Sequence, residues 1–184
     1  MTAWVLGAAA FAAMEPLTAA THRFVMHGIG MRLHRSHHRR TAAGLEANDA
    51  FPVMFAVVVC LGLWVGFNAP SWSELVPIGL GITAYGATYA LVHDVYIHGR
   101  LRMFGDRRIV VLDRLADAHA LHHRFGGAPF GMLVPIVPRR VRRLEAEPNW
   151  TLSDREALPD PVSEDRIDEL GPAVLGVQVT RVEQ

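Results

Sequence analysis

Three long apolar stretches limit what this chain can fold into. They cover residues 3 to about 20, residues 50–67 and residues 75–92. Each has about 18 residues, close to the shortest α-helix that spans a hydrocarbon core of roughly 30 Å. The second and third stretches contain no charged residue and are joined by a short polar connector with Trp72. The pattern therefore predicts a helical hairpin in a membrane, with an interfacial Trp in its turn.

The first stretch differs because it contains Glu15 and Pro16. It lacks the positively charged leading region of a secretory signal peptide, so we expect a membrane helix that extends towards His27. A carboxylate inside such a helix is costly unless it is paired or solvated. We therefore expect Glu15 to face the protein interior.

The arginines indicate how these helices are oriented. Residues 21–143 contain fifteen Arg and seven acidic residues, whereas the connector at residues 68–74 contains no Arg. Positive residues stay on the cytoplasmic side of a membrane. We therefore expect the histidine-bearing segments on the cytoplasmic side of the cell membrane, and the N-terminus outside.

The fold class that follows is an all-α membrane protein. We expect three to four transmembrane helices and a cytoplasmic helical cap, with a cap helix over residues 109–125. The apolar piece at residues 128–138 is too short to span and rich in Pro and Gly, so we expect it to enter the interface or to cover a cavity. We divide the chain into a membrane domain, residues 1–144, and an acidic, Pro-containing tail, residues 145–184, expected to be partly disordered.

The ten histidines form two copies of two motifs, and no histidine lies outside them. The HX4H motif occurs as His22 with His27 and as His93 with His98. The HX2HH motif occurs as His34, His37 and His38 and again as His119, His122 and His123. In an α-helix, positions i, i+3 and i+4 lie within about 100° of arc, so each HX2HH presents three imidazoles from one face.

The HX4H motif poses a geometric problem, because positions i and i+5 of a regular helix are about 140° apart. Both histidines can bind one metal only if the helix ends or bends between them. Gly28 and Gly99 directly follow the second histidine of each pair, and glycine suits the end of a helix. We therefore expect each pair where a membrane helix emerges into the cytosol.

These motifs predict a site for two metal ions. One cysteine, Cys60, cannot build a thiolate site, so the metal site must rest on histidine and carboxylate side chains. Imidazole suits iron, zinc, copper and nickel, and ten imidazoles exceed the three or four of a zinc site. We expect the metal pair itself to be the catalytic group, with no separate acid or base.

The same residues resemble bacterial β-carotene hydroxylases of the CrtZ type, which belong to the membrane fatty acid hydroxylase and sterol desaturase superfamily. The resemblance covers about residues 4–140. It is carried by His22-Arg23-Phe24-Val25-Met26-His27-Gly28, His34-Arg35-Ser36-His37-His38, Glu46-Ala47-Asn48-Asp49, Thr83-Ala84-Tyr85-Gly86, Val92-His93-Asp94 and Ala118-His119-Ala120-Leu121-His122-His123.

The resemblance implies a di-iron monooxygenase of carotenoid biosynthesis. Such an enzyme uses O₂ to hydroxylate the β-ionone rings of β-carotene at carbon 3, giving β-cryptoxanthin and then zeaxanthin. It also implies that all ten histidines are metal ligands. The chain contains no GxGxxG motif and no cysteine cluster, so electrons must come from outside; the family expectation is reduced ferredoxin with its reductase.

Other residues are candidates for roles around the metals. Asp94, Asn48 and Asp49 are candidates to orient histidine ligands, although Asn48 and Asp49 could equally cap the second membrane helix. The basic cluster Arg139, Arg140, Arg142 and Arg143 suits either an acidic ferredoxin or anionic lipid. Candidates for an apolar substrate pocket open to the bilayer are Met54, Phe55, Trp64, Tyr85 and Tyr89.

Two alternatives remain open. Within the same fold, the substrate could be a fatty acid, a sterol or a keto-carotenoid, and the reaction hydroxylation, desaturation or ketolation. In another class, the chain could be a metal-binding membrane protein without enzymatic activity. We expect membrane lipids as partners and no nucleic acid.

Overall fold

The three apolar stretches form the three longest helices of the structure, a computed structural model that describes residues 2–38, 44–105, 107–139 and 141–142. The expected domain boundary at residue 144 and the acidic tail lie outside the described residues. The elements in chain order are α1 (Thr2–Ala20), η1 (Thr21–Ile29), α2 (Met31–His38), η2 (Ala47–Asp49), α3 (Ala50–Asn68), η3 (Pro70–Trp72), α4 (Leu75–Ala90), η4 (Leu91–Ile97) and α5 (Val110–Phe125).

Three helical segments are long and apolar enough to cross a membrane: Ala3–Ile29, Ala47–Asn68 and Leu75–Ile97. The described residues contain helices and no strand, so the predicted all-α membrane class is confirmed. The first span continues through η1 to Ile29, and it therefore includes His27, towards which the sequence predicted that it extends. The polar connector forms the single turn η3, with Pro70 at its start, where a missing N–H costs nothing.

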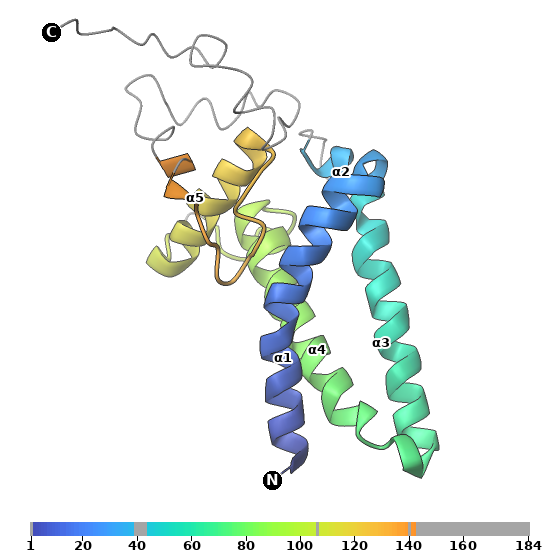
Figure 1. Cartoon of the computed structure of the whole chain (residues 1–184). Helices are drawn as coiled ribbons and strands as arrows, with labels where there is room; N and C mark the ends of the chain where they lie inside the picture. The colour runs from blue at the N-terminus through green and yellow to red at the C-terminus, as the bar shows by residue number, and fades with distance from the viewer. Residues whose placement is uncertain (1, 39–43, 106, 140, 143–184) are drawn as a thin grey trace, which may run out of the picture.

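Helix α4 packs against both α1 and α3 through glycines. A Cβ atom added to Gly81 would overlap the carbonyl oxygen of Gly7, so α1 and α4 touch backbone to backbone. On the other side, the Leu63 side chain of α3 occupies the space beside Gly79. Small residues allow such close approach between membrane helices, where van der Waals contact replaces the hydrophobic effect. Figure 1 shows α4 crossing α1, with α3 standing further away along most of its length.

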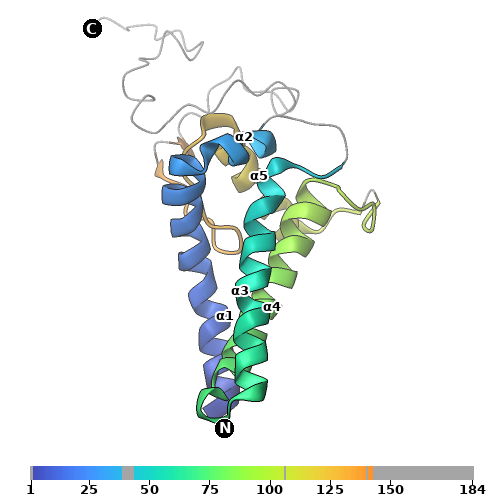
Figure 2. The same ribbon diagram turned by 90° about the vertical axis from the view of Figure 1, so that its right-hand side faces the viewer.

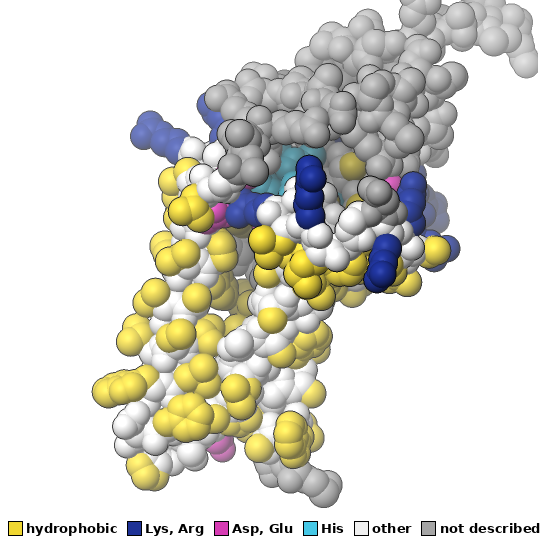
Figure 3. Space-filling model, turned by 180° about the vertical axis from the view of Figure 1, so that it is seen from behind, with side chains coloured by type: hydrophobic (Ala, Val, Ile, Leu, Met, Phe, Trp, Pro, Cys, Tyr) yellow, Lys and Arg dark blue, Asp and Glu magenta, His cyan; other side chains and the backbone are white. Residues whose placement is uncertain are grey.

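The remaining elements form a head at the end of the stem opposite to the N-terminus (Figure 1). Helix α5, close to the expected cap helix, is tied to η4 because the Tyr96 hydroxyl donates to Asp113 Oδ1 at 2.7 Å and accepts from the Ile109 N–H at 3.0 Å. Arginines gather around the head, whereas the stem presents apolar side chains (Figure 3).

The chain after α5 turns back towards the stem. Figure 2 shows this segment, drawn in orange, descending between the upper ends of α1 and α3. It includes the apolar piece at residues 128–138 that was expected to enter the interface or cover a cavity, and its backbone binds to α1 as described below.

Candidate metal centre

All ten histidine side chains converge in the head, where they form two groups. In the first histidine group, one ring nitrogen of each residue lies within 4.8 Å of the others. In the second histidine group, one ring nitrogen of each of four residues likewise lies within 4.8 Å of the others. A fifth residue, His123, adjoins these four: its Nε2 lies 2.8 Å from His119 Nε2 and 3.1 Å from His37 Nε2. The first group is His22, His27, His34, His38 and His122. The second is His37, His93, His98 and His119, together with His123.

The two HX2HH motifs exchange one histidine each. His34 and His38 stay in the first group, but His37, between them in sequence, lies in the second. His119 and His123 lie in the second group, and His122 crosses into the first. The expected single face of three imidazoles therefore serves two groups, because the i+3 residue is rotated away from the i and i+4 pair. This exchange locks α2 and α5 together around the cluster.

The HX4H pairs meet through π-helical turns rather than by helix termination alone. Both η1 and η4 are π-helices, whose hydrogen bonds join residues five apart. The His98 N–H donates to the His93 carbonyl at 3.0 Å, which sets these two positions over one another. Each expected glycine also contributes: Gly28 carries a kink inside η1, and Gly99 has a left-handed φ of 62° directly after the second pair.

In His22 and His34, Nδ1 points out of the cluster and Nε2 points into it. The hydrogen bonds of the Nδ1 atoms indicate that the Nε2 atoms suit a cation. His22 Nδ1 lies 3.2 Å from the carbonyl oxygen of Phe130, and His34 Nδ1 lies 2.8 Å from Asn48 Oδ1. Both partners only accept, so each ring must donate from Nδ1, and its Nε2 then carries a bare lone pair when the ring is neutral. The two Nε2 atoms nevertheless face each other at 3.0 Å. Two lone pairs at that distance repel unless a positive ion lies between them, so the donor set fits a metal.

The protonation states agree with this arrangement. Burial lowers the pKa of each histidine of the head outside the three spans, and neighbouring histidines lower most of them further. The pKa falls to about 2 for His38 and about 3 for His98. These imidazoles are therefore neutral at physiological pH, the form that binds metals.

Neutral groups orient the first histidine group. Besides Asn48 and the Phe130 carbonyl, the Gly127 carbonyl accepts from His122 Nδ1 at 2.6 Å. Two of these three acceptors are backbone atoms of the segment that follows α5. The Phe130 ring also contacts the rings of His22 and His122, with centroids 5.6 and 5.4 Å apart.

Carboxylates stand behind the second histidine group. Asp94 Oδ1 accepts from His93 Nδ1 at 3.1 Å, and Glu46 Oε2 lies 3.5 Å from His37 Nδ1. Arg100 ties these acids together, reaching Glu46 Oε1 at 3.2 Å, Asp94 Oδ1 at 3.7 Å and Asp49 Oδ1 at 2.8 Å. Asp49 therefore binds Arg100 and caps η2 through the Glu46 N–H, while Asp94 and Asn48 reach histidines.

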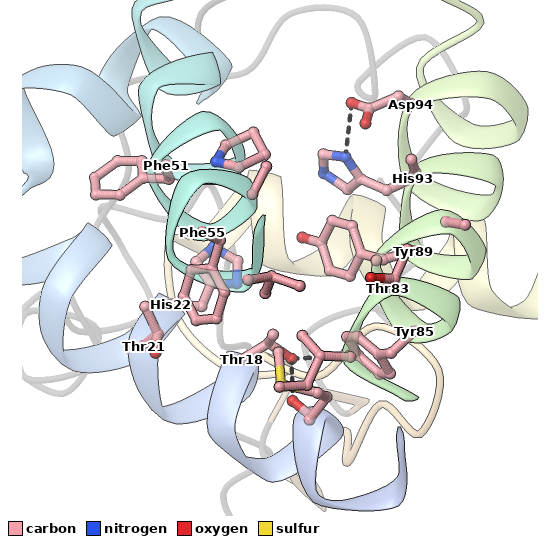
Figure 4. A pocket seen from close by; sticks show the side chains of 18 of the residues that line it. Thr18, Thr21, His22, Phe51, Phe55, Thr83, Tyr85, Tyr89, His93 and Asp94 are labelled. Atoms are coloured by element: carbon pink, nitrogen blue, oxygen red, sulfur yellow. Dashed lines mark hydrogen bonds and ion pairs between the residues drawn. The ribbon is translucent and has the colours of Figure 1, made fainter. Parts of the chain in front are cut away.

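An apolar cavity of about 450 Å³ lies between α1, α3 and α4, directly below the histidines. His22 on the α1 side and His93 on the α4 side face it from opposite walls, and Tyr85 and Tyr89 line it along α4 (Figure 4). Three of the five expected pocket residues, Phe55, Tyr85 and Tyr89, line this cavity. The cavity thus joins both histidine groups to the membrane-spanning part of the chain.

The expectation for Met54 and Trp64 needs correction. Neither lines the cavity, and both side chains are exposed on the outer surface of α3. The residues of α3 that line the cavity lie on the other face of the helix, and they include Phe51, Phe55 and Val59, which follow one another at intervals of about one turn. Sequence reasoning also missed Glu46, Arg100 and Phe130 as neighbours of the histidines; a backbone carbonyl such as that of Phe130 leaves no signal in a sequence.

Comparison with characterised proteins finds several similar chains. A protein named beta-carotene hydroxylase from Pseudescherichia vulneris is 40% identical over 152 residues, covering 80% of this chain and 85% of the relative. A beta-carotene hydroxylase from Paracoccus sp. (strain PC1) is 38% identical and covers 69% of this chain and 78% of its own. The chloroplastic beta-carotene 3-hydroxylase of Haematococcus lacustris is 34% identical over 75% of this chain but only 47% of the relative.

The other two comparisons found no counterpart. No protein-family model matches the chain, and no solved structure matches it.

Proposed function

This chain belongs to the family of β-carotene hydroxylases, and we propose that it hydroxylates carbon 3 of the β-ionone rings of β-carotene, first to β-cryptoxanthin and then to zeaxanthin. The observation that carries the proposal is the apolar cavity between membrane helices that ends at two groups of histidines. A hydrocarbon dissolved in the bilayer can enter such a cavity without crossing water.

We infer that the ten histidines hold two irons, one in each group. When bound, such a pair supplies the activation of O₂ and the removal of a hydrogen atom from the ring carbon. The chain itself provides neutral imidazoles with their Nε2 lone pairs turned inwards, and outer acceptors that fix this tautomer. The balanced reaction consumes the C–H substrate, O₂, two electrons and two protons, and it yields the alcohol and water.

The cavity walls position the substrate. A carotene has no polar group, so shape and apolar contact must place the ring below the histidines. Phe55, Tyr89 and Phe130 offer aromatic surface close to His22 and His93, and the Tyr89 ring lies 5.0 Å from the His93 ring. The hydroxyl of Tyr85 is turned away towards Glu15, which leaves its ring to the cavity.

We propose that the chain crosses the cell membrane several times, with the histidine end in the cytoplasm. Arginines surround the head, and the connector at the opposite end has none (Figure 3). Electrons would arrive there from reduced ferredoxin and its reductase. Arg139 and Arg142 are exposed on that side and suit an acidic donor; Arg140 and Arg143 of the same expected cluster lie outside the described residues.

Product analysis in a host that makes β-carotene tests the proposal. Expression of the chain should convert β-carotene to β-cryptoxanthin and zeaxanthin, and His34→Ala should abolish the conversion. Unchanged carotene with altered fatty acids or sterols would contradict the proposed substrate, and keto-carotenoids would contradict the reaction. Metal bound without any reaction with O₂ would instead support a non-enzymatic metal-binding protein.

A pair of glycines tests the cavity itself. A Cβ atom on either Gly86 or Gly62 meets nothing within 4 Å, so both positions of the membrane helices accept a side chain. Gly86 lines the cavity and Gly62 does not. Gly86→Leu should therefore reduce zeaxanthin formation about tenfold or more with unchanged metal content, whereas Gly62→Leu should resemble the wild type. Equal effects of the two substitutions would argue against this cavity as the substrate site.

A further inference from the structure

Glu15 is an ionisable residue about halfway along the first membrane span, and the hydroxylation chemistry does not use it. Its side chain is partly buried, and among the hydrogen bonds of the described residues it makes none to a histidine. A carboxylate at such depth persists only when its partners compensate for the lost water.

The partners of Glu15 are donors from a distant segment and from α4. Its Oε1 accepts the N–H groups of Leu133 and Val134 at 3.1 and 2.9 Å. Its Oε2 accepts the Tyr85 hydroxyl at 2.6 Å and lies 3.2 Å from the Leu133 nitrogen. Thr18, one turn along α1, lies 2.8 Å from the same Tyr85 hydroxyl, a contact marked in Figure 4. The carboxylate thus joins α1, α4 and the segment after α5.

The segment that Glu15 holds also holds two histidines. Gly127 accepts from His122 Nδ1 and Phe130 accepts from His22 Nδ1, both through backbone carbonyls. These carbonyls lie three to seven residues before the amides that bind Glu15. Both histidines belong to the first histidine group. Behind the second group, Asp94 accepts from His93 Nδ1 and the Glu46 carboxylate lies 3.5 Å from His37 Nδ1.

The space around the carboxylate is filled. A Cβ atom added to Gly131 would lie 2.7 Å from Glu15 Oε1 and 3.0 Å from the Val134 carbonyl oxygen. The segment therefore approaches the Glu15 carboxylate so closely that a side chain at residue 131 would have to displace it or the Val134 carbonyl.

We propose that Glu15 is a positioning residue for the first histidine group: from within the membrane it anchors residues 127–134, whose carbonyls set the orientation of His22 and His122. The proposal rests on the part of the proposed function in which the histidine groups hold metal. It predicts a selective effect, since the carboxylates seen behind the second group in the described residues, Asp94 and Glu46, lie outside the anchored segment.

Cobalt(II) titration of the metal-free protein in detergent micelles, followed by visible absorption, tests this proposal. The wild type should bind two ions per chain. Removing a partner that orients a metal ligand weakens binding by about 10–100-fold. Glu15→Gln, which replaces one acceptor oxygen by a donor, should therefore weaken one binding step about tenfold or more and leave the other unchanged. Glu15→Asp, which keeps the carboxylate, should restore part of the lost affinity.

Two further variants keep the result interpretable. Gly131→Ala disturbs the same contact from the other side and should weaken the same step, even if Glu15→Gln fails to fold. Thr88→Ala removes a polar group of α4 whose hydrogen bond, among the described residues, is to the Ala84 carbonyl of its own helix, and it should leave both steps unchanged.

The outcomes separate clearly. Wild-type affinity for both ions in a helical Glu15→Gln protein, or an equal loss of both steps in Glu15→Gln and Gly131→Ala, would overturn the proposal. The titration needs neither carotene nor turnover. A wild type that binds two ions but forms no zeaxanthin would therefore contradict the proposed function while leaving the role of Glu15 measurable.

Discussion

The two histidine groups have the same ligand chemistry but different surroundings. Each takes its histidines from both halves of the chain, yet neutral amide and carbonyl oxygens stand behind the first group. Behind the second group are Asp94 and Glu46, linked by Arg100. A carboxylate behind a histidine makes the imidazole a stronger donor than a carbonyl does. Two sites built from the same two repeated motifs are therefore not equivalent: we expect the second group to bind metal more tightly and to stabilise its more oxidised state.

The largest effects should come from removing one ligand from either group. His34→Ala in the first group and His119→Ala in the second should each abolish hydroxylation, because both metals are needed, and each should lower the metal content from two ions to about one. Metal analysis of the purified variants checks this. If one substitution removed both metal ions, the two histidine groups would not bind metal independently of each other.

Exchanging the outer acceptors should reverse the asymmetry. Asp94→Asn removes the charge behind His93 and should weaken binding at the tighter site by about 10–100-fold. Asn48→Asp places a charge behind His34 and should strengthen the weaker site by up to about tenfold. Stepwise metal titration of both single variants and of the double variant measures this. Asp94→Asn with unchanged affinities would show that the carboxylate does not distinguish the sites.

The smallest difference is expected in the response of the metal-free protein to acid. Burial lowers the pKa of His38 in the first group and of His123 in the second. The folded chain then binds fewer protons than the unfolded chain below pH 6.5, so its stability falls as the pH drops from about 6.5 towards 4. Each such histidine contributes at most about 1.4 kcal/mol per pH unit to this slope.

His38→Gln and His123→Gln should therefore flatten the dependence of the unfolding temperature on pH to a similar extent, and neither should matter above about pH 7. Thermal unfolding of the metal-free variants between pH 4.5 and 8 provides the measurement. A steeper slope in either variant would have the wrong sign for a buried, neutral histidine.

Much of the fold could be read from local sequence. The uncharged runs that end at Phe67 and Val92 are long enough to span a membrane, and length and polarity alone decide that property. The faces of α3 could not be predicted, because its residues are apolar on all sides and carry no periodicity that marks an inner surface. Met54 and Trp64 were therefore placed in the pocket although they lie outside it, and packing of Leu63 on Gly79 sets the actual orientation.

The histidine site shows the same division. The motifs gave the ligand types and the expectation of two metals, but the crossing of His37 and His122 depends on how α2 and α5 face each other. The π-helical turns depend on a shifted backbone hydrogen bond at His98, for which side-chain identity gives no direct signal. Glu15 was marked by its charge in an apolar helix; its partners at Leu133 and Val134 are 118 and 119 residues away.

The exchange of histidines between the two motifs also constrains the order of biosynthesis. The first group needs His122 and the second needs His119, and both residues lie on α5, after all three spans in the chain. A ribosome that has released the chain only as far as His98 has made seven of the ten histidines, but neither group is complete. On the proposed assignment, both metals are loaded only after α5 has been made, and a chain truncated before α5 would reach the bilayer with two incomplete histidine groups.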